Sequence, residues 1–496
     1  MTSSNPTDTQ HALEEIDAIR HELGPDLGDQ IVAAMYQRAE TIANDVVDRS
    51  GRKFTLDERL DTLLTHPIWG WPIMLGLLAL VFWLTVAGAN VPSSFLAGLL
   101  IEQGGLSNWI TTYLGLTAPA WLSVSGYELL HMGFAAAHVP TPATGLLVDG
   151  VYLCLAWVVS VMLPPMAIFF PMFTFLEDLG YLPRVAFNLD WLFKKSGAHG
   201  KQALTMAMGF GCNAAGVTAC RIIDSPREKL IAILTNNFMI CNGRFPTIIA
   251  IASLLVAGGV ASGWLVGTLA AATMIGVVLL GIAFMFATSW VLSRTVLKGE
   301  ASAFTLELPP YRRPALGRIL YTSLIDRTIF VLGRACAVAA PAGAVIWLVA
   351  HIHLAGEPIA THVIHFLDPL GWALGLSGVI LLAYLIAIPA NEIVVPTLVM
   401  LLILVSGDAG LGLETGKMVE PDREGLASLL DAAGWTTLTS VCLLLFVLLH
   451  NPCATTIWTI WKETRSAKWT TLGALMPVAI GFATCAAVAG IWRLIA

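Results

Sequence analysis

Apolar stretches of about 20 residues or more recur along most of this chain, and each is long enough to cross a bilayer as a helix. A soluble domain carries roughly a quarter charged residues. Of the 496 residues here, 56% are hydrophobic and only 12% are charged. These features predict an all-α polytopic membrane protein with about 7–9 membrane segments.

The placement of Lys and Arg predicts which loops face the cytoplasm, because cytoplasmic loops carry an excess of both. Residues 91–145 contain neither and are expected outside, whereas residues 184–201 and 294–327 are rich in both and are expected inside. The simple crossings predicted on this basis are residues 68–89, 146–175, 229–257, 263–292, 328–350 and 426–460.

Two apolar stretches fit poorly as simple crossings. Residues 203–222 have basic residues on both flanks, and residues 372–405 are broken at the sequence IPANEIVVP. Both are better explained as re-entrant hairpins, one dipping from each membrane face. The order span, hairpin, span, span then occurs twice, in opposite orientations. Inverted repeats with interrupted helices at matching positions are typical of secondary transporters, whose substrate site lies at the interruptions.

This organisation divides the chain into five predicted parts. They are a cytoplasmic helical segment (1–66), the first span with an exterior segment (67–145), the first repeat (146–297), a cytoplasmic linker (298–327) and the second repeat (328–496). No signal peptide is expected, because Met1–Gln10 is polar. All eight cysteines lie in apolar segments, which indicates free thiols rather than a secreted disulfide framework.

Each repeat contains two interruptions that place a helix breaker beside a group able to bind a cation. They are GFGCN (209–213) and CNGRFP (241–246), then IPANE (388–392) and HNPC (450–453). Non-helical backbone at membrane depth persists only where it is buried in protein or lines a wet cavity. Freed carbonyls, thiols, amides and one carboxylate are therefore expected to converge between the repeats. The candidate metal ligands are Cys212, Asn213, Cys241, Glu392, His450 and Cys453.

Glu392 is the sharpest candidate, since an ionisable residue in such a segment marks a functional site by default. The alternative is that Glu392 pairs with Arg244 and only holds the repeats together, because buried charges need partners. Cys212, Cys241 and Cys453 lie inside interruptions. The other five cysteines lie in uninterrupted apolar runs and are expected to be packing residues.

Two further groups of residues have competing interpretations. Glu177 and Asp178 end a span on the cytoplasmic side, where they form either an exit station for a cation or a helix terminus paired with Arg184. The exterior histidines either collect metal before uptake or are ordinary loop residues; they are His351, His353, His362 and His365.

Mixed thiol, imidazole, amide and carboxylate donors suit a borderline transition metal better than Na⁺ or Mg²⁺. Spacing alone does not choose among Fe²⁺, Mn²⁺ and Zn²⁺. The chain contains no G-x-x-x-x-G-K-[ST] phosphate loop and no H-E-x-x-H sequence. An enzyme that hydrolyses nucleotides or a zinc protease is therefore not expected in this chain.

At these motifs the chain resembles the membrane domain of the bacterial ferrous-iron transport protein B (FeoB) family. The similarity runs from Glu58 to the C-terminus and includes, in family order, LEDLGYLPRVAF, GFGCN, DSPREKL, LELPPYRRP, ANEIVVPTL and LLHNPCATT. The resemblance implies two inverted gate-type repeats and Fe²⁺ uptake across the inner membrane. The positions that it matches to the family's gate cysteines, gate carboxylate and Leu-Glu-Asp segment are Cys212, Cys241, Cys453, Glu392, Glu177 and Asp178.

The gates depart from the usual family sequence. Asn213 is followed by Ala-Ala-Gly instead of Val-Pro-Ala, Asn391 replaces a lysine, and His450 with its neighbour Asn451 replaces Tyr-Thr. The added imidazole and the lost ammonium favour metal binding along the pathway. The preferred ion is therefore either Fe²⁺ or another divalent metal. The family also fuses a GTPase domain ahead of the first span. We expect either a separately encoded small GTPase that docks on residues 1–66 or a channel that runs without nucleotide.

The sequence thus predicts a multi-pass inner-membrane transporter or channel with a cytoplasmic N-terminus, which carries Fe²⁺ into the cytoplasm and holds no permanent cofactor. Its expected partners are the metal ion and the lipid bilayer but not nucleic acid, and a homo-oligomer is compatible with this organisation. One alternative is a gate-type transporter of another divalent metal or of a nucleoside. Another is a membrane thiol enzyme or assembly factor that binds metal without moving it.

Overall fold

The computed structural model describes residues 27–46, 56–102, 104–117, 119–257, 263–299, 310–354, 356–406 and 423–495. The described residues form helices joined by short turns, with one pair of two-residue strands. The predicted all-α class is therefore confirmed. Residues 1–26 of the predicted cytoplasmic segment and residues 300–309 of the predicted linker lie outside the described residues.

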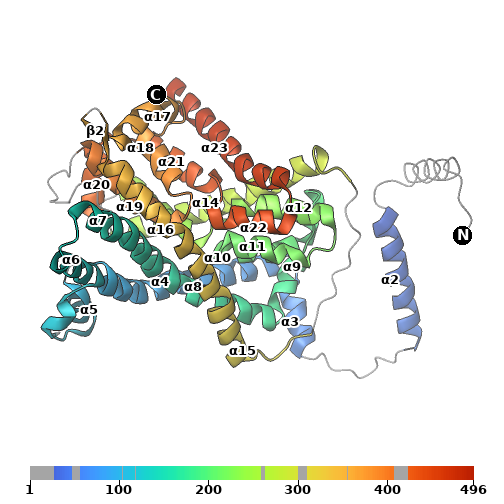
Figure 1. Cartoon of the computed structure of the whole chain (residues 1–496). Helices are drawn as coiled ribbons and strands as arrows, with labels where there is room; N and C mark the ends of the chain where they lie inside the picture. The colour runs from blue at the N-terminus through green and yellow to red at the C-terminus, as the bar shows by residue number, and fades with distance from the viewer. Residues whose placement is uncertain are drawn as a thin grey trace, which may run out of the picture.

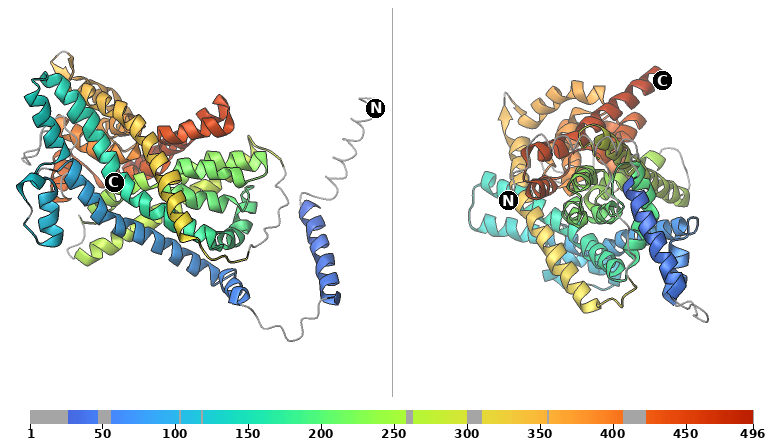
Figure 2. Two further views of the ribbon diagram at one scale, coloured as in Figure 1. Left: turned by 60° about the horizontal axis from the view of Figure 1, so that its bottom comes forward. Right: turned by 90° about the vertical axis from the view of Figure 1, so that its right-hand side faces the viewer.

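The N-terminal part contains the first long apolar helix and the exterior segment. Its elements are α2 (Leu27–Val46), α3 (Leu56–Leu64), α4 (Gly70–Leu100), α5 (Gly105–Leu114), the 3-10 turn η1 (Ala120–Ser123) and α6 (Gly126–Ala136). Helix α4 runs beyond the predicted span because its sequence stays apolar past Pro92, which it holds inside the helix. Helix α2 stands apart from the helical bundle (Figures 1 and 2).

The first half of the bundle runs from the exterior segment to the basic linker. Its elements are α7 (Thr141–Thr144), the π-helical η2 (Gly145–Tyr152), α8 (Leu153–Asp178), α9 (Tyr181–Lys195), α10 (Gln202–Gly211), α11 (Asn213–Ala219), η3 (Cys220–Ile222), α12 (Pro226–Thr235), η4 (Asn236–Phe238), η5 (Asn242–Arg244), α13 (Phe245–Ala257) and α14 (Gly263–Arg294).

The second half follows the linker. Its elements are α15 (Leu316–Tyr321), the π-helical η6 (Thr322–Ile329), α16 (Phe330–His351), β1 (His353–Leu354), β2 (Glu357–Pro358), α17 (Ile359–Ala373), α18 (Gly378–Ile386), η7 (Asn391–Ile393), α19 (Val394–Ser406), α20 (Arg423–Ala432), α21 (Thr437–Leu449), α22 (Ala454–Thr464) and α23 (Ala467–Ile495). The two strands pair antiparallel, with His353 opposite Pro358.

The two halves present their helices in the same order. Each starts with a long helix (α8 and α16), continues with a helix of 15 residues (α9 and α17) and then turns back in a broken hairpin (α10–α11 and α18–α19). Each ends with a second broken pair (α12–α13 and α21–α22) and another long helix (α14 and α23). The two halves therefore share one order of helices, whereas the opposite orientation of the two repeats in the membrane stays a prediction.

Among the described residues, six helices are long and apolar enough to cross a membrane. The count rises to seven if α17 and α18, which meet at a bend of 111°, form one interrupted span. The chain is thus a multi-pass membrane protein. The stretch 229–257, predicted as one crossing, is instead interrupted between α12 and α13.

The two halves interlock through their broken helices. Helix α11 packs against α22, α13 against α21, and α12 against α23. Helix α8 joins both halves, since it contacts α4 and α10 as well as α16 (Figure 1). The interruptions therefore lie inside protein rather than against lipid, as unpaired backbone at membrane depth requires.

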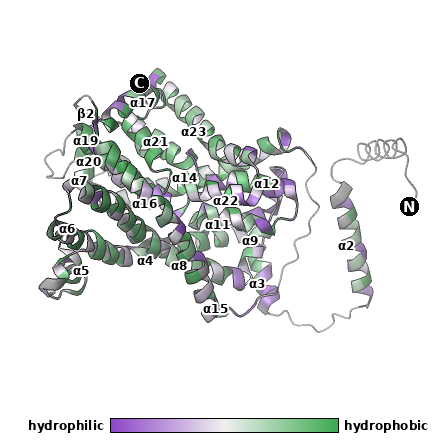
Figure 3. Cartoon of the chain, in the orientation of Figure 1, coloured by the Kyte–Doolittle hydropathy of each residue, from purple (hydrophilic) through white to green (hydrophobic). Residues whose placement is uncertain are grey.

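Hydrophilic residues gather at the end of the bundle where α3, α9 and α12 lie (Figure 3). Gly180, with φ of 87°, makes the left-handed turn that ends α8 and starts α9. Arg184 on α9 donates to both carboxylate oxygens of Asp61 on α3, at 2.9 and 3.3 Å, and the Tyr311 hydroxyl donates to the same carboxylate at 2.9 Å. One carboxylate thereby ties together three segments that are far apart in sequence.

Candidate functional site

Each of the four breaks begins with one residue of extended backbone that stands directly before a helical turn. These residues, with their φ and ψ angles, are Cys212 (−156°, 125°), Cys241 (−75°, 163°), Ala390 (−150°, 122°) and Cys453 (−62°, 158°). They precede α11, η5, η7 and α22. Three cysteines thus occupy equivalent positions, each at the N-terminal end of a helical segment.

The four breaks meet at one pocket of about 30 Å³. The predicted ligands that line it are Cys212, Asn213, Cys241, Glu392 and Cys453. Its other walls comprise Met162 and Met166 of α8, Val331 and Ala335 of α16, and small or polar residues of the breaks. A pocket must offer roughly 10–15 Å³ to hold one water molecule. This space accommodates a single ion or one to two waters, and no aromatic ring lines it.

The carboxylate of Glu392 packs against the backbone of Gly243. A Cβ atom added to Gly243 would collide with Oε1 and Cδ of Glu392, so this position leaves no room for a side chain. Glycine in the CNGRFP interruption therefore lets the second-half carboxylate lie directly against the first-half break. Gly243 was not among the predicted site residues.

Buried asparagines hold the breaks in place. Asn236 Nδ2 donates to the Asn213 carbonyl at 3.0 Å, and Asn237 Nδ2 donates to the His450 carbonyl at 2.9 Å. The Asn213 amide is best satisfied with Nδ2 donating to the carbonyls of Gly209 (3.0 Å) and Met239 (3.1 Å). Carbonyls and amides that the helix breaks leave unpaired thus find partners across the breaks, as buried backbone requires. Asn236 and Asn237 were not predicted as site residues, although two adjacent amides in an apolar run are a visible signal.

Arg244 does not pair with Glu392, which was the alternative interpretation. Its guanidinium donates to the carbonyls of Asn237 and Leu448, both at 3.0 Å, and to Asn237 Oδ1 at 2.9 Å. Arg244 is 1% exposed, so these acceptors replace the water that its charge would otherwise need. The arginine therefore joins the breaks of the two halves through backbone carbonyls and leaves the Glu392 carboxylate at the pocket wall.

His450 lies behind the pocket wall rather than on it. Its Nδ1 donates to the Val447 carbonyl at 2.8 Å, and its Nε2 lies 3.2 Å from Asn391 Oδ1. The amide of Asn391 in turn lies 3.8 Å from Cys241 Sγ. The predicted ligand His450 thus reaches the pocket only through Asn391, which itself lines it.

Glu177 and Asp178 lie at the end of α8 and face other arginines than the predicted Arg184. Glu177 lies 3.4 Å from Arg327, and Asp178 lies 3.5 Å from Arg318. Both arginines come from the segment that leads into α16, because α8 packs beside it. The structure places these two acidic residues away from the pocket, at the basic end of the bundle.

The exterior histidines do not form a cluster. His351 Nδ1 donates to the Trp347 carbonyl and His353 Nδ1 to the His351 carbonyl, both at 2.9 Å, while His362 Nε2 donates to the Leu354 carbonyl at 2.8 Å. His365 is exposed on α17. Over the described residues, no group of three or more His, Cys, Asp or Glu side chains has the spacing of a complete metal site.

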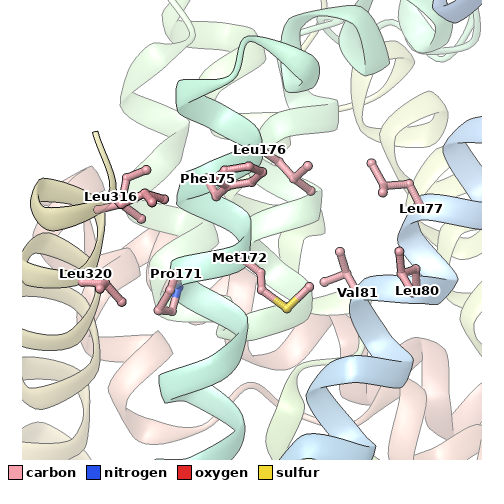
Figure 4. A pocket seen from close by; sticks show the side chains of 10 residues that line it. Leu77, Leu80, Val81, Pro171, Met172, Phe175, Leu176, Leu316 and Leu320 are labelled. Carbon is pink, nitrogen blue, oxygen red and sulfur yellow. The ribbon is translucent and has the colours of Figure 1, made fainter. Parts of the chain in front are cut away.

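A second hollow, of about 420 Å³, lies between α4, α8 and α15 (Figure 4). Every residue that lines it is apolar; they are Leu77, Leu80, Val81, Pro171, Met172, Phe175, Leu176, Leu316, Ile319 and Leu320. Only the thioether of Met172 offers a donor atom, and it is a weak one. This hollow suits hydrocarbon and is no candidate for a cation site.

Comparison with known proteins agrees with this architecture. The family model described as "Nucleoside recognition" (Gate) matches residues 159–255, which hold the first two breaks. The model described as "Ferrous iron transport protein B C terminus" matches residues 274–326. The chain is also 27% identical over 463 residues to a protein named Fe(2+) transporter FeoB from Staphylococcus aureus (strain MSSA476), which covers 89% of this chain. The chain is thus similar to FeoB proteins over most of its length.

Other FeoB relatives give the same coverage. Proteins named Fe(2+) transporter FeoB from Synechocystis and from Leptospira biflexa are 25% and 26% identical and cover 86% and 84% of this chain. The chain spans about three fifths of the length of these relatives, since the matched regions are 60%, 61% and 57% of the three proteins. No solved structure matches the chain significantly.

Proposed function

We propose that this FeoB-like chain moves a divalent transition-metal ion, with Fe²⁺ as its cargo, across the inner membrane into the cytoplasm. The observation that carries the proposal is the convergence of three thiols and one carboxylate on a pocket with room for one ion. The name Fe(2+) transporter, which the relatives bear, supports the same cargo.

The proposed ligands are Cys212, Cys241, Cys453 and Glu392, with the thioethers of Met162 and Met166 as weaker donors. Thiolate, thioether and carboxylate together favour a borderline transition metal over Na⁺ or Mg²⁺. A thiol must lose its proton to bind metal, so binding releases protons. A transported ion must also leave, and a site that engages only some of these donors at a time allows release.

The exit route in this proposal runs between α11 and α22, which lead from Cys212 and Cys453 to the basic end of the bundle. Arg221 in η3, the turn that follows α11, donates to both oxygens of Glu463 on α22, at distances of 2.6 to 3.1 Å. This ion pair closes the route in the present conformation, and its separation would open it. Glu177 and Asp178 would then receive the ion. Their ion pairs with Arg327 and Arg318 would break at this step.

The basic end of the bundle faces the cytoplasm in this proposal, because Lys and Arg concentrate in cytoplasmic loops. Helix α2 then lies on the cytoplasmic side and carries an exposed apolar stripe of Ile31, Met35, Ile42 and Val46. A separately encoded small GTPase docking on this stripe is the partner we propose. Alanine at Met35 and Ile42 should then abolish any stimulation of flux by the GTPase while leaving basal flux unchanged.

A nucleoside is the competing cargo, given the description of the Gate model. Pockets for small organic ligands measure roughly 300–1,000 Å³ and are lined largely by apolar and aromatic groups. The pocket of about 30 Å³ without an aromatic wall does not favour this cargo.

The test is flux into sealed liposomes that contain the purified chain. Fe²⁺, Mn²⁺, Zn²⁺ and a radiolabelled nucleoside are supplied outside, with and without added GTPase. We expect uptake of Fe²⁺ and no uptake of nucleoside. Metal binding without any flux would support the thiol enzyme or assembly factor instead, and nucleoside uptake would support the competing cargo.

A further inference from the structure

The exterior segment carries a hollow of about 430 Å³, which lies outside the proposed transport path. It is lined by Ser123, Val124, Tyr127, Glu128, His131 and Met132, from α6 and the turn before it. Residues 67–176 contain no Lys or Arg but three acidic residues, which are Glu102, Glu128 and Asp149. An excess of one charge sign raises the local concentration of the opposite ion. The charged side chains of this segment are therefore acidic only, which favours cations over anions.

Helix α6 presents a carboxylate and an imidazole to the same hollow. Glu128 and His131 are three residues apart, which places them on one face of the helix. A Glu-x-x-His pair with this spacing supplies two ligands to one metal ion in helical proteins. The capping box fixes Glu128 at the start of α6, since its Oε2 accepts from the Ser125 backbone amide at 2.9 Å. The other carboxylate oxygen of Glu128, Oε1, is the one that a metal ion in the hollow would contact.

Asp149 orients the imidazole of His131. The Nε2 of His131 donates to Asp149 Oδ1 at 2.9 Å, and the Tyr127 hydroxyl donates to the same oxygen. Because Nε2 carries the proton, Nδ1 holds the lone pair. Histidines that bind metals usually donate their other ring nitrogen to a carboxylate in this way, which fixes the tautomer and raises the basicity of the ligand.

The surroundings support a built site rather than a chance contact. Asp149 lies in the π-helical η2, and such distortions within helices occur frequently at functional sites. The Asp149 side chain is 11% exposed, whereas that of His131 is 33% exposed, so the orienting carboxylate is sheltered and the imidazole is accessible. Three exterior histidines of the second half, His351, His353 and His362, contact backbone carbonyls instead of a carboxylate.

We propose that Glu128 and His131 form a weak exterior capture site for a divalent transition-metal ion, in which Asp149 positions His131. This proposal rests on the proposed transport function. The ion would bind at this exterior site before it reaches the pocket at the helix breaks. Two protein ligands completed by water make an open site. Weak binding suits a site that must pass its ion onward.

The first experiment measures binding without transport. The purified chain in lipid nanodiscs is titrated with Co²⁺, whose binding to oxygen and nitrogen ligands gives weak visible bands without the strong thiolate charge-transfer absorption of a cysteine site. We expect the wild type to bind one Co²⁺ without thiolate absorption. Glu128→Gln and His131→Gln should each weaken this binding, and Asp149→Asn should weaken it about tenfold or more by misorienting His131.

His138→Asn is the matched control. His138 is another exterior histidine, it lies outside the hollow, and its φ of 55° is a conformation that asparagine tolerates. This variant should bind Co²⁺ like the wild type. Thiolate-free binding that persists in the Glu128→Gln/His131→Gln double variant would overturn the proposal, provided that the unfolding temperature of the variant is unchanged.

The second experiment separates capture from transport. In Fe²⁺ flux assays, Glu128→Gln and His131→Gln should raise the concentration for half-maximal flux and leave the maximal flux unchanged. An unchanged half-maximal concentration in both variants would contradict a capture role. Absence of Fe²⁺ flux in the wild type would refute the transport function, whereas loss of thiolate-free Co²⁺ binding in the variants would still establish the exterior site.

Discussion

At the scale of single residues, the pocket depends on which side chains the breaks bring together. Cys212, Cys241 and Cys453 occupy equivalent places before helical turns, and Glu392 reaches the same pocket because Gly243 leaves space for it. Arg244 supplies no counter-charge to Glu392, since its guanidinium donates to carbonyl and amide oxygens. The carboxylate is therefore placed to meet a cation.

Replacing a proposed ligand should stop transport but not folding. Cys212→Ser and Glu392→Gln should each reduce metal flux by about tenfold or more, because each removes a charged donor while nearly preserving volume. Flux into liposomes measures the effect. Cys442→Ala is the control, since Cys442 is buried in α21 away from the pocket and should leave flux nearly unchanged. A variant with normal flux would exclude its residue from the pathway.

A methyl group at Gly243 should displace Glu392. Gly243→Ala places a Cβ atom against the Glu392 carboxylate, so we expect flux to fall several-fold even though no ligand is removed. The control is Gly276→Ala on α14, where an added Cβ atom would have no neighbour within 4 Å. Equal flux in the two variants would show that the position of the carboxylate does not matter.

At the scale of elements, the proposed transport depends on the broken helices. Helices α11 and α22 follow directly after Cys212 and Cys453 and pack against each other, and Arg221, just beyond α11, pairs with Glu463 of α22. Each helix therefore links the pocket to the same surface of the bundle. An alternating-access cycle needs such elements, because separating two rigid helices opens a path without disturbing the pocket.

Breaking the Arg221–Glu463 pair should open the cytoplasmic path. The side chain of Arg221 is 60% exposed but that of Glu463 is only 6% exposed, so Arg221→Ala leaves a sheltered carboxylate without its partner and should cost about 1–3 kcal/mol of stability. The rate at which a water-soluble thiol reagent labels Cys453 from the cytoplasmic side should nevertheless rise. The charge-swapped variant Arg221→Glu/Glu463→Arg should restore slow labelling. If Arg221→Ala is labelled no faster than the wild type, this pair does not close the route.

At the scale of the whole molecule, contacts between distant segments hold the bundle together. Asp61 of α3, Arg184 of α9 and Tyr311 of the linker meet at the basic end of the bundle. Burial by itself raises the pKa of Asp61, but the hydrogen bonds from Arg184 and Tyr311 and the charge of Arg184 outweigh it and hold this pKa below its usual value. The folded structure therefore stabilises the ionised form of Asp61.

This cluster should give an acid-dependent contribution to stability. An aspartate in the unfolded chain titrates near ~3.9. Since the folded pKa of Asp61 lies lower, its contribution is fully present above that pH and is lost as the pH falls through the folded pKa. Asp61→Asn should lower the free energy of unfolding by about 1–3 kcal/mol at neutral pH.

Thermal unfolding in detergent, measured against pH, checks this prediction. The difference in unfolding temperature between wild type and Asp61→Asn should be constant above about pH 5 and should shrink below about pH 4. Asp57→Asn on the same helix is the control. The difference in unfolding temperature between wild type and Asp57→Asn should not shrink as the pH falls. A difference that stays constant down to pH 3 would contradict the role of Asp61.

The sequence by itself determined the elements and their breaks. Hydropathy predicted the helices, and glycine or proline beside polar residues predicted the interruptions at Cys212, Cys241, Glu392 and Cys453. These features are local, because the cost of placing a charge or an unpaired backbone group in lipid depends on the segment itself. The same local signals predicted that the hairpins occur at matching positions of the two halves.

Only the tertiary structure decided which groups meet. Arg244 contacts Asn237 and Leu448 instead of Glu392, and Glu177 faces Arg327 instead of Arg184. Several polar residues along the sequence are candidate partners for each of these charges. The choice among them depends on how α8, α13 and α21 pack across more than a hundred residues, since packing fixes which acceptors replace the lost water.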